Sequence, residues 1–292
     1  MGTLEVKNLS YTYGKGAPYE IKALDDVSLT FDGGMITGLI GHTGSGKSTL
    51  VQMLNGLMKP DSGKVLLDGC DIWEKPKKIR DIRFRVGLVM QYPEYQLFEE
   101  TVEKDIAFGP RNMGMSEAEI HDAVRRAARF SGLSEKHLKK SPFDLSGGQK
   151  RRAALAGVIA MSPEVLVLDE PAAGLDPGAR REILGRIKSY QRESGTAVVI
   201  VSHSMEDMAM YCDRVAVMDH GRLMMTGTPA EVFSRAEELY AAGLDVPQIT
   251  KVAAHLREHG VDIGLDVYTV GYAAEKLISL EKEAAQSRHK QI

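Results

Sequence analysis

The sequence has little cysteine, few aromatic residues and no long apolar run. Of its 292 residues only Cys70 and Cys212 are cysteines, and they lie far apart without metal-ligand spacing. We therefore expect two reduced, small, buried side chains rather than a disulfide framework. No segment approaches the ~20 consecutive apolar residues of a membrane span. Any membrane association is expected to depend on a surface or a partner.

The sequence also has no excess of either charge. The formal net charge is -3, which gives no general attraction to nucleic acid. The hydrophobic fraction of 43% and the charged fraction of 26% are typical of a soluble globular protein. Near the N-terminus Glu5 and Lys7 interrupt any apolar stretch, so no signal peptide is expected. The function must come from local sites.

The apolar runs predict an α/β fold with a mainly parallel sheet. Several short runs end in a polar or glycine cluster, as buried parallel strands do. Helical segments over 47–57 and 178–193 lie between some of them, which favours a layered α/β arrangement. The expected strands are 35–40, 86–90, 165–168, 197–201 and 215–218.

Outside these strands and helices we predict N-terminal β elements, an inserted helical subdomain and a C-terminal extension. Strand signals vanish over about 93–163 and helical ones replace them, at 116–131 and 147–161, so we predict an inserted α-helical subdomain. The N-terminal β elements, the parallel sheet and this subdomain together are predicted to form a nucleotide-binding domain over residues 1–234. Residues 235–292 are predicted to form a short C-terminal helical extension, with helices over 250–259 and 272–283 and a polar tail.

A phosphate-binding loop is the strongest local signal. The stretch GHTGSGKST fits G-x-x-x-x-G-K-[ST] between a predicted strand and a predicted helix. Glycines let successive backbone N–H groups face a phosphate chain, and the helix adds its positive end. Lys47 is expected to reach the β- and γ-phosphates and Ser48 to hold Mg²⁺. The predicted nucleotide-binding loop is Gly41, His42, Thr43, Gly44, Ser45, Gly46, Lys47, Ser48 and Thr49.

Other predicted strands also deliver polar side chains to the same sheet edge. The strand in VLVLDEP ends in Asp169, suited to magnesium, and Glu170, suited to a general base that orients the attacking water. Gln91 follows the run 86–90 and is expected to contact magnesium or the water. His203 follows the run 197–201 and is expected to hydrogen-bond the γ-phosphate.

The stretch LSGGQ looks like a second anion-binding device. Ser146 is a good N-cap, and Gly147 and Gly148 would expose backbone donors at the start of a largely apolar helix. Because the first phosphate loop already serves the chain's own nucleotide, we predict that Ser146, Gly147, Gly148 and Gln149 bind the γ-phosphate held by another subunit. Two chains would then pack head to tail around two ATP molecules.

With these motifs the sequence resembles the ATP-binding cassette family over about residues 3–234. The resemblance rests on the phosphate loop, Gln91, LSGGQ, LVLDEP, the AGLDP loop and His203. It implies ATP hydrolysis with Mg²⁺, stacking of Tyr13 on adenine, and contact of Asp176 with the opposite subunit. Ala172 stands where many relatives have Thr or Ser.

A narrower resemblance is to the ATPase subunits of energy-coupling factor importers. It rests on GHTGSGKSTLVQMLNGLMKPDSG, on VPQITKVAAHLREHGVDI, which is similar to their C-terminal extension, and on QYPEYQLFEETVEKDIAFGPRN, which is similar to their second ATPase paralogue. The resemblance implies ATP-driven uptake of a vitamin or a transition-metal ion. It also implies a second ATPase subunit, a transmembrane coupling subunit, a substrate-binding membrane subunit and a peripheral place on the cytoplasmic side of the cell membrane.

In that group the coupling subunit docks beside the loop that contains Gln91. A set of aromatic and acidic residues could offer the contacts, and they could equally form a hinge between subdomains. The set is Tyr92, Glu94, Tyr95, Phe98 and Glu99.

Other functions fit the sequence less well. A cytosolic cassette protein acting on nucleic acid or ribosomes usually carries two cassettes or a long coiled-coil insertion, and neither is present. A GTPase would need an N-K-x-D guanine reader, which is missing. A catalytically dead module would be expected to lose Lys47, Glu170 or His203, and all three remain.

Overall fold

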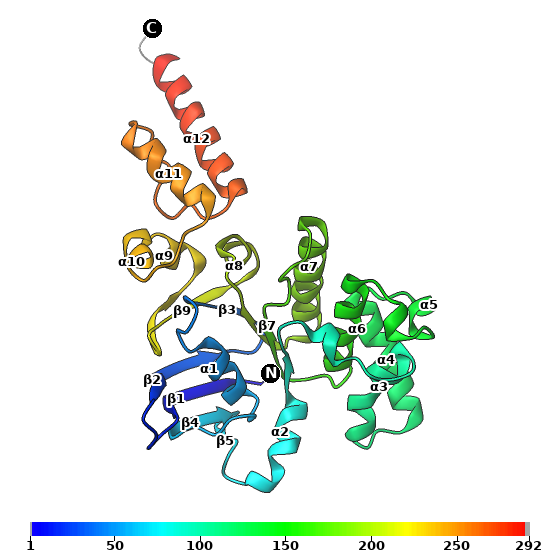
Figure 1. Ribbon diagram of the computed structural model, residues 1–292. Coiled ribbons are helices and arrows are strands. Elements are labelled where there is room, and N and C mark those ends of the chain that lie inside the picture. Colours follow the sequence, from blue (N-terminus) through cyan, green and yellow to red (C-terminus); the bar gives the residue numbers. More distant parts are fainter. Residues whose placement is uncertain (1, 290–292) are drawn as a thin grey trace.

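Two β-sheets and a set of surrounding helices make up the fold (Figure 1). The computed structural model describes residues 2–289, with side chains described as far as Glu283. The predicted polar tail runs into residues 290–292, which lie outside the described part.

The larger sheet has the strand order β10-β9-β3-β8-β7-β6. Four of its five strand pairings are parallel, and the edge pair of β9 and β10 is antiparallel. Apolar and β-branched runs form the parallel strands because helices or the second sheet cover both faces. The strands are β3 (Ile36–Ile40), β6 (Val86–Val89), β7 (Val165–Asp169), β8 (Ala197–Val201), β9 (Arg214–Asp219) and β10 (Arg222–Gly227).

The smaller sheet is antiparallel, with the order β2-β1-β4-β5. In β1, the strand next to the β2 edge, Leu4, Val6 and Leu9 are buried, while the residues between them are more exposed. The strands are β1 (Leu4–Tyr13), β2 (Ile21–Phe31), β4 (Ser62–Leu67) and β5 (Cys70–Asp71). After β5 come the short η1 (Pro76–Lys78) and α2 (Ile79–Arg85), in which no residue is buried.

The region after β6 is helical as far as β7. Its longest helix, α4, begins at the capping box of Ser116 and Glu119 and ends at Gly132 in the left-handed conformation. Figure 1 shows this group, in green, set to one side of the parallel sheet. The elements are η2 (Pro93–Gln96), α3 (Val102–Asn112), α4 (Glu117–Ser131), α5 (Glu135–Leu138), η3 (Pro142–Asp144) and α6 (Gly147–Ile159).

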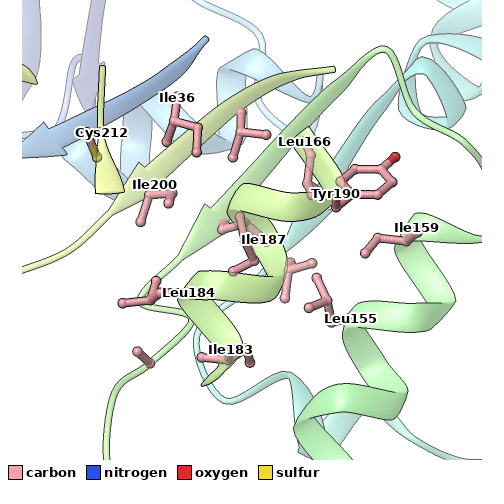
Figure 2. Close-up of a cluster of buried hydrophobic side chains, with 14 of the residues drawn as sticks. Ile36, Leu155, Ile159, Leu166, Ile183, Leu184, Ile187, Tyr190, Ile200 and Cys212 are labelled. Carbon is pink, nitrogen blue, oxygen red and sulfur yellow. The ribbon is translucent and has the colours of Figure 1, made fainter. Parts of the chain in front are cut away.

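The two faces of the parallel sheet belong to different hydrophobic cores. In β8, Val198 and Ile200 join the core beneath the helical region, and Val199 and Val201 join the core beneath the antiparallel sheet. This alternation follows from the two-residue period of a strand. Figure 2 shows the first core, where side chains of α7 (Pro177–Ser194) pack between the sheet and α6.

The C-terminal helices carry a small core of their own. Ala253, Ile263, Val267 and Ala273 are buried together between α11 (Gln248–Glu258) and α12 (Val270–His289). Figure 1 places this pair, in orange and red, beyond α8 (Met205–Tyr211), α9 (Pro229–Phe233) and α10 (Ala236–Ala241). Among the described residues no helix is long and apolar enough to cross a membrane.

Some predicted bounds and burials were wrong. The first helix, α1 (Lys47–Leu54), ends three residues before the predicted position because Gly56 turns the chain with a φ of +69°. Cys70 is exposed on the short edge strand β5, although Cys212 is buried as expected. Burial raises the pKa of the Cys212 thiol far above its ordinary value, so this thiol is inert.

Candidate active site

The phosphate-binding loop joins β3 to α1 and wraps around its own lysine. The Lys47 Nζ donates hydrogen bonds to the carbonyl oxygens of Gly41 at 2.7 Å and His42 at 2.9 Å. Gly46 has a φ of +98°, and a Cβ built on it would lie 2.4 Å from the Ala23 carbonyl oxygen. Only glycine fits there. Burial lowers the pKa of the Lys47 ammonium, against the opposing charges of Glu170 and Asp169.

A cleft of about 480 Å³ opens beside this loop and brings together side chains from distant parts of the sequence. Residues from the phosphate loop, from the ends of three parallel strands and from the antiparallel sheet line it. The predicted site residues in its lining are Tyr13, Thr43, Gly44, Gly46, Lys47, Ser48, Thr49, Gln91, Asp169, Glu170 and His203.

Two carboxylates lie at the end of β7. Glu170 has a φ of +51°, a left-handed conformation that is uncommon for a residue with a side chain. Its Oε1 is buried and has no hydrogen-bond partner among the described residues. Burial, and next the Asp169 carboxylate, raise the pKa of Glu170 to about 7. A carboxyl group with a buried, unpartnered oxygen beside a phosphate loop is the environment of a general base.

His203 faces this carboxylate from the neighbouring strand. Its Nε2 lies 3.6 Å from Glu170 Oε1, and its side chain is 58% exposed. Burial and the Lys47 ammonium lower the pKa of the imidazole, so the neutral form is favoured. A neutral imidazole can donate one hydrogen bond into the cleft and accept another.

The lining of the cleft includes residues that sequence reasoning missed. Ile21 and Ala23 line it together with Tyr13, whose hydroxyl lies 3.2 Å from Thr49 Oγ1, and Val201 lines it beside Glu170. The sequence held no signal for Ile21, because its exposure and its pairing with Tyr13 appear only in the folded sheet. An exposed apolar side chain beside an exposed tyrosine suits a planar ring.

Gly41, His42 and Ser45 belong to the loop but are not among the residues that line the cleft. Gly41 and Ser45 are buried behind the loop, where a Cβ on Gly41 would meet the Met218 carbonyl oxygen at 2.3 Å. These residues support the loop on the side away from the cleft. The predicted contacts with nucleotide would be made by the other loop residues, which line the cleft.

The predicted second anion-binding device lies on α6, away from the cleft lining. Ser146 caps the helix: its Oγ accepts from Gln149 N at 3.4 Å, and Gln149 Oε1 accepts from Ser146 N at 3.0 Å. A Cβ on Gly147 or Gly148 would meet nothing within 4 Å. The helix therefore opens outward with free space in front of its first turn.

Asp176 has a local role as the N-cap of α7. Its Oδ1 accepts hydrogen bonds from Gly178 N at 2.9 Å and Ala179 N at 3.0 Å. These bonds lower the pKa of the carboxyl group, so it stays ionised. The side chain is exposed, and its predicted contact with an opposite subunit remains a prediction.

Glu94 does not offer the free acidic contact that the sequence suggested. The carboxylate forms a two-pronged ion pair with Arg151 of α6, at 2.7 Å and 3.1 Å. The arginine side chain is only 4% exposed, and its Nη1 also donates to the Ala173 carbonyl oxygen. The pair therefore connects the segment after Gln91 to the LSGGQ helix.

Comparison with known proteins agrees with this geometry. The family described as "ABC transporter" matches residues 24–173, just over half of the chain. The chain belongs to this family. It is 52% identical to the energy-coupling factor transporter ATP-binding protein EcfA2 of Clostridium acetobutylicum, over 96% of this chain and 99% of that one. It is 54% identical to the protein of the same name from Symbiobacterium thermophilum, over 91% and 92% of the two chains.

Solved structures of the family share the fold. cbiO1 from Clostridium perfringens, described as part of the ABC transporter complex cbiONQ, matches with a TM-score of 0.74 and 40% identity, over 87% of this chain and 98% of that one. The dimeric cassette MJ0796, bound to ADP and phosphate after hydrolysis, matches with a TM-score of 0.70 and 26% identity, over 77% and 98%. The predicted α/β phosphate-loop fold is confirmed, and ATPase activity is the activity of this family.

Proposed function

We propose that this chain is an ATP-binding and ATP-hydrolysing subunit of an energy-coupling factor importer. The observation that carries the proposal is the cleft in which Lys47, Asp169, Glu170 and His203 meet. The near-complete coverage of relatives named for energy-coupling factor transport supports the importer context. ATP hydrolysis here would power uptake of a vitamin or a transition-metal ion through membrane subunits.

In this proposal each residue has a distinct task. Lys47 exchanges its loop carbonyl partners for phosphate oxygens, and the N–H groups of the loop hold the remaining charge. Glu170, whose Oε1 has no partner, accepts a hydrogen bond from the attacking water and orients it. His203 donates to the γ-phosphate, and Tyr13 stacks on adenine. ATP is the substrate of this reaction.

The residues present fit a magnesium ion. The Ser48 hydroxyl, the Gln91 amide and the Asp169 carboxylate line one cleft, and oxygen ligands are those that Mg²⁺ prefers. We assign these three residues to hold it. Bound there, Mg²⁺ would supply neutralisation of the charge that develops on the transferred phosphoryl group. Burial raises the pKa of Asp169, which a nearby cation would reverse.

A second ATPase subunit, a paralogue or another copy, completes the active unit in this proposal. The open first turn at Gly147 and Gly148 supports it, since a Cβ built on either glycine would meet no described atom within 4 Å. In a head-to-tail pair, Ser146 to Gln149 would approach the γ-phosphate bound by the partner, and Asp176 would lie at the interface.

The transmembrane coupling subunit would dock on a groove between the segment after Gln91 and the helical region. Leu97, Phe98 and Phe108 line this groove, and the last two rings pack edge to face at 5.0 Å. Tyr95 is 85% exposed nearby. Exposed aromatic side chains are typical anchors of protein interfaces. A substrate-binding membrane subunit would complete a complex on the cytoplasmic side of the cell membrane, and no nucleic acid takes part.

Co-expression with and without the membrane subunits tests the importer assignment. We expect the chain in the membrane fraction only when the coupling subunit is present, because its negative net charge is repelled by anionic lipid. Phe98→Glu should weaken this recruitment while leaving nucleotide affinity unchanged. Tyr19→Glu, at a more exposed aromatic position outside the groove, is the control. Tight binding to protein-free lipid vesicles, or recruitment unaffected by Phe98→Glu, would contradict the proposal.

A further inference from the structure

Two histidines and an aspartate meet behind the phosphate-binding loop. His42 is the second residue of the loop, Asp219 ends β9, and His220 follows in the turn before β10. One ligand atom from each of the three lies within 4.8 Å of the others. His42 Nε2 is 3.0 Å from Asp219 Oδ1, and His220 Nε2 is 3.8 Å from the same oxygen. None of the three lines the nucleotide cleft.

The hydrogen bonds of His42 decide which of its ring nitrogens faces Asp219. Its Nδ1 lies 2.8 Å from the Thr43 carbonyl oxygen, which can only accept, so Nδ1 carries a proton. In the neutral imidazole Nε2 then presents a lone pair to the Asp219 carboxylate. This nitrogen lies 3.0 Å from Asp219 Oδ1, so a metal ion could be bound by the ring nitrogen and the carboxylate oxygen together.

The backbone holds the ligands in place without an ion. Gly221 N donates to the Ser45 carbonyl oxygen at 3.1 Å, which ties the β9–β10 turn to the phosphate loop. β9 also pairs with β3, the strand that leads into the loop. The bond from Nδ1 to Thr43 fixes the imidazole tautomer and orientation, as outer hydrogen bonds of metal-binding histidines do.

We propose that His42, Asp219 and His220 bind one divalent transition-metal ion of the Zn²⁺, Ni²⁺ and Co²⁺ class. Two imidazoles and one carboxylate are ligands that such ions accept and that Mg²⁺ and Ca²⁺ do not favour. Two ligands at about 2.0–2.2 Å from a metal lie roughly 3.0–3.5 Å apart, which matches the 3.0 Å between His42 and Asp219. His220, at 3.8 Å from Asp219, would move slightly closer on binding. Because the site is outside the cleft, the ion and the nucleotide bind together, and the ion fastens the loop to the β9–β10 turn.

A second histidine cluster must be removed before the site is tested. His255, Glu258 and His259 lie on and just after α11, and all three are exposed. Histidines four residues apart on a helix can also bind transition metals. The test therefore uses the His255→Gln/His259→Gln double variant as its background.

The experiment is calorimetric titration of the chelator-treated full chain with Zn²⁺ alone, without nucleotide or magnesium. We expect one site per chain in the background variant, and a loss of affinity of about 10–100-fold or more when His220→Asn is added. Asparagine tolerates the left-handed conformation of His220, whose φ is +44°. His121→Asn in α4 provides a control at a histidine outside both clusters. Co²⁺ in place of Zn²⁺ gives a visible spectrum that reports imidazole ligation.

The outcomes separate the alternatives. Unchanged ATP affinity in His220→Asn shows that the fold is intact, since this residue does not line the cleft. Zn²⁺ binding that survives His220→Asn, or that is absent once the α11 histidines are removed, overturns the proposal.

Discussion

His203 Nε2 lies 3.6 Å from Glu170 Oε1, across the ends of two adjacent parallel strands. The distance is longer than a hydrogen bond, so the imidazole is not hydrogen-bonded to this oxygen. The glutamate side chain is 14% exposed and the histidine side chain 58%. The carboxylate is thus sheltered, while the imidazole is free to turn toward a phosphate.

The first prediction concerns Glu170→Gln. The amide keeps the shape of the side chain but cannot act as a base. We expect ATP affinity to be preserved and turnover to fall by a factor on the order of 10² or more. Nucleotide binding by equilibrium titration and phosphate release by a steady-state assay measure the two effects. Near-normal turnover would exclude Glu170 as the base.

The same substitution should change how stability depends on pH. The pKa of Glu170 is about 7 in the folded chain and 4.5 in the reference state, so the folded chain binds more protons between these values. Ionising this carboxyl group therefore costs stability as pH rises from 4.5, and the cost is complete above pH 7.

Without nucleotide or magnesium, Glu170→Gln should be the more stable protein above pH 7, with the advantage vanishing near pH 4.5. The gain is on the order of 3 kcal/mol at most, from 1.36 kcal/mol per pKa unit. Denaturant unfolding across this range measures it. Parallel stability curves for the two proteins would contradict the raised pKa.

The parallel core was predictable because its strands are continuous apolar runs. Residues 197–201 were placed without error, and the bounds of the other parallel strands differ by one residue at one or both ends. The end of α1 was not predictable in this way, because the left-handed Gly56 interrupts an apolar pattern that continues to Leu57. β10 and α10 gave no periodic signal strong enough to be predicted.

The cleft was also predictable in large part, because strand ends of a parallel sheet meet at one edge. Gln91, Asp169 and His203 meet there for that reason. The pairing of Glu94 with Arg151 was not predictable, since 57 residues separate the partners and nothing in either local pattern indicates the other. The same holds for the meeting of His42 with Asp219, which are 177 residues apart.

The Glu94–Arg151 pair gives a prediction about stability. Arg151→Met would leave the largely buried Glu94 carboxylate without its partner, which typically costs about 3–5 kcal/mol. The adjacent Arg152→Met removes a more exposed pair with Glu182 and should cost about 1 kcal/mol or less. Urea unfolding measures both. The double change Glu94→Leu/Arg151→Met should recover most of the loss. Equal losses of unfolding free energy in Arg151→Met and Arg152→Met would show that the buried ion pair contributes no more to stability than the exposed one.

The last prediction concerns the open first turn of α6. If Gly147 faces the γ-phosphate bound by another subunit, Gly147→Asp places a carboxylate against it. Like charges at an interface cost several kcal/mol, enough to prevent ATP-dependent association. The chain itself should still fold and bind ATP, because a Cβ at Gly147 meets nothing within 4 Å and the residue is not in the cleft lining.

Sedimentation in the Glu170→Gln background, with any paralogous subunit supplied, measures this association. Gly147→Asn, equal in shape and uncharged, separates charge from bulk. An unchanged ATP-driven dimer would refute the role in trans, and lost ATP affinity in the single subunit would mean that the stretch serves its own site.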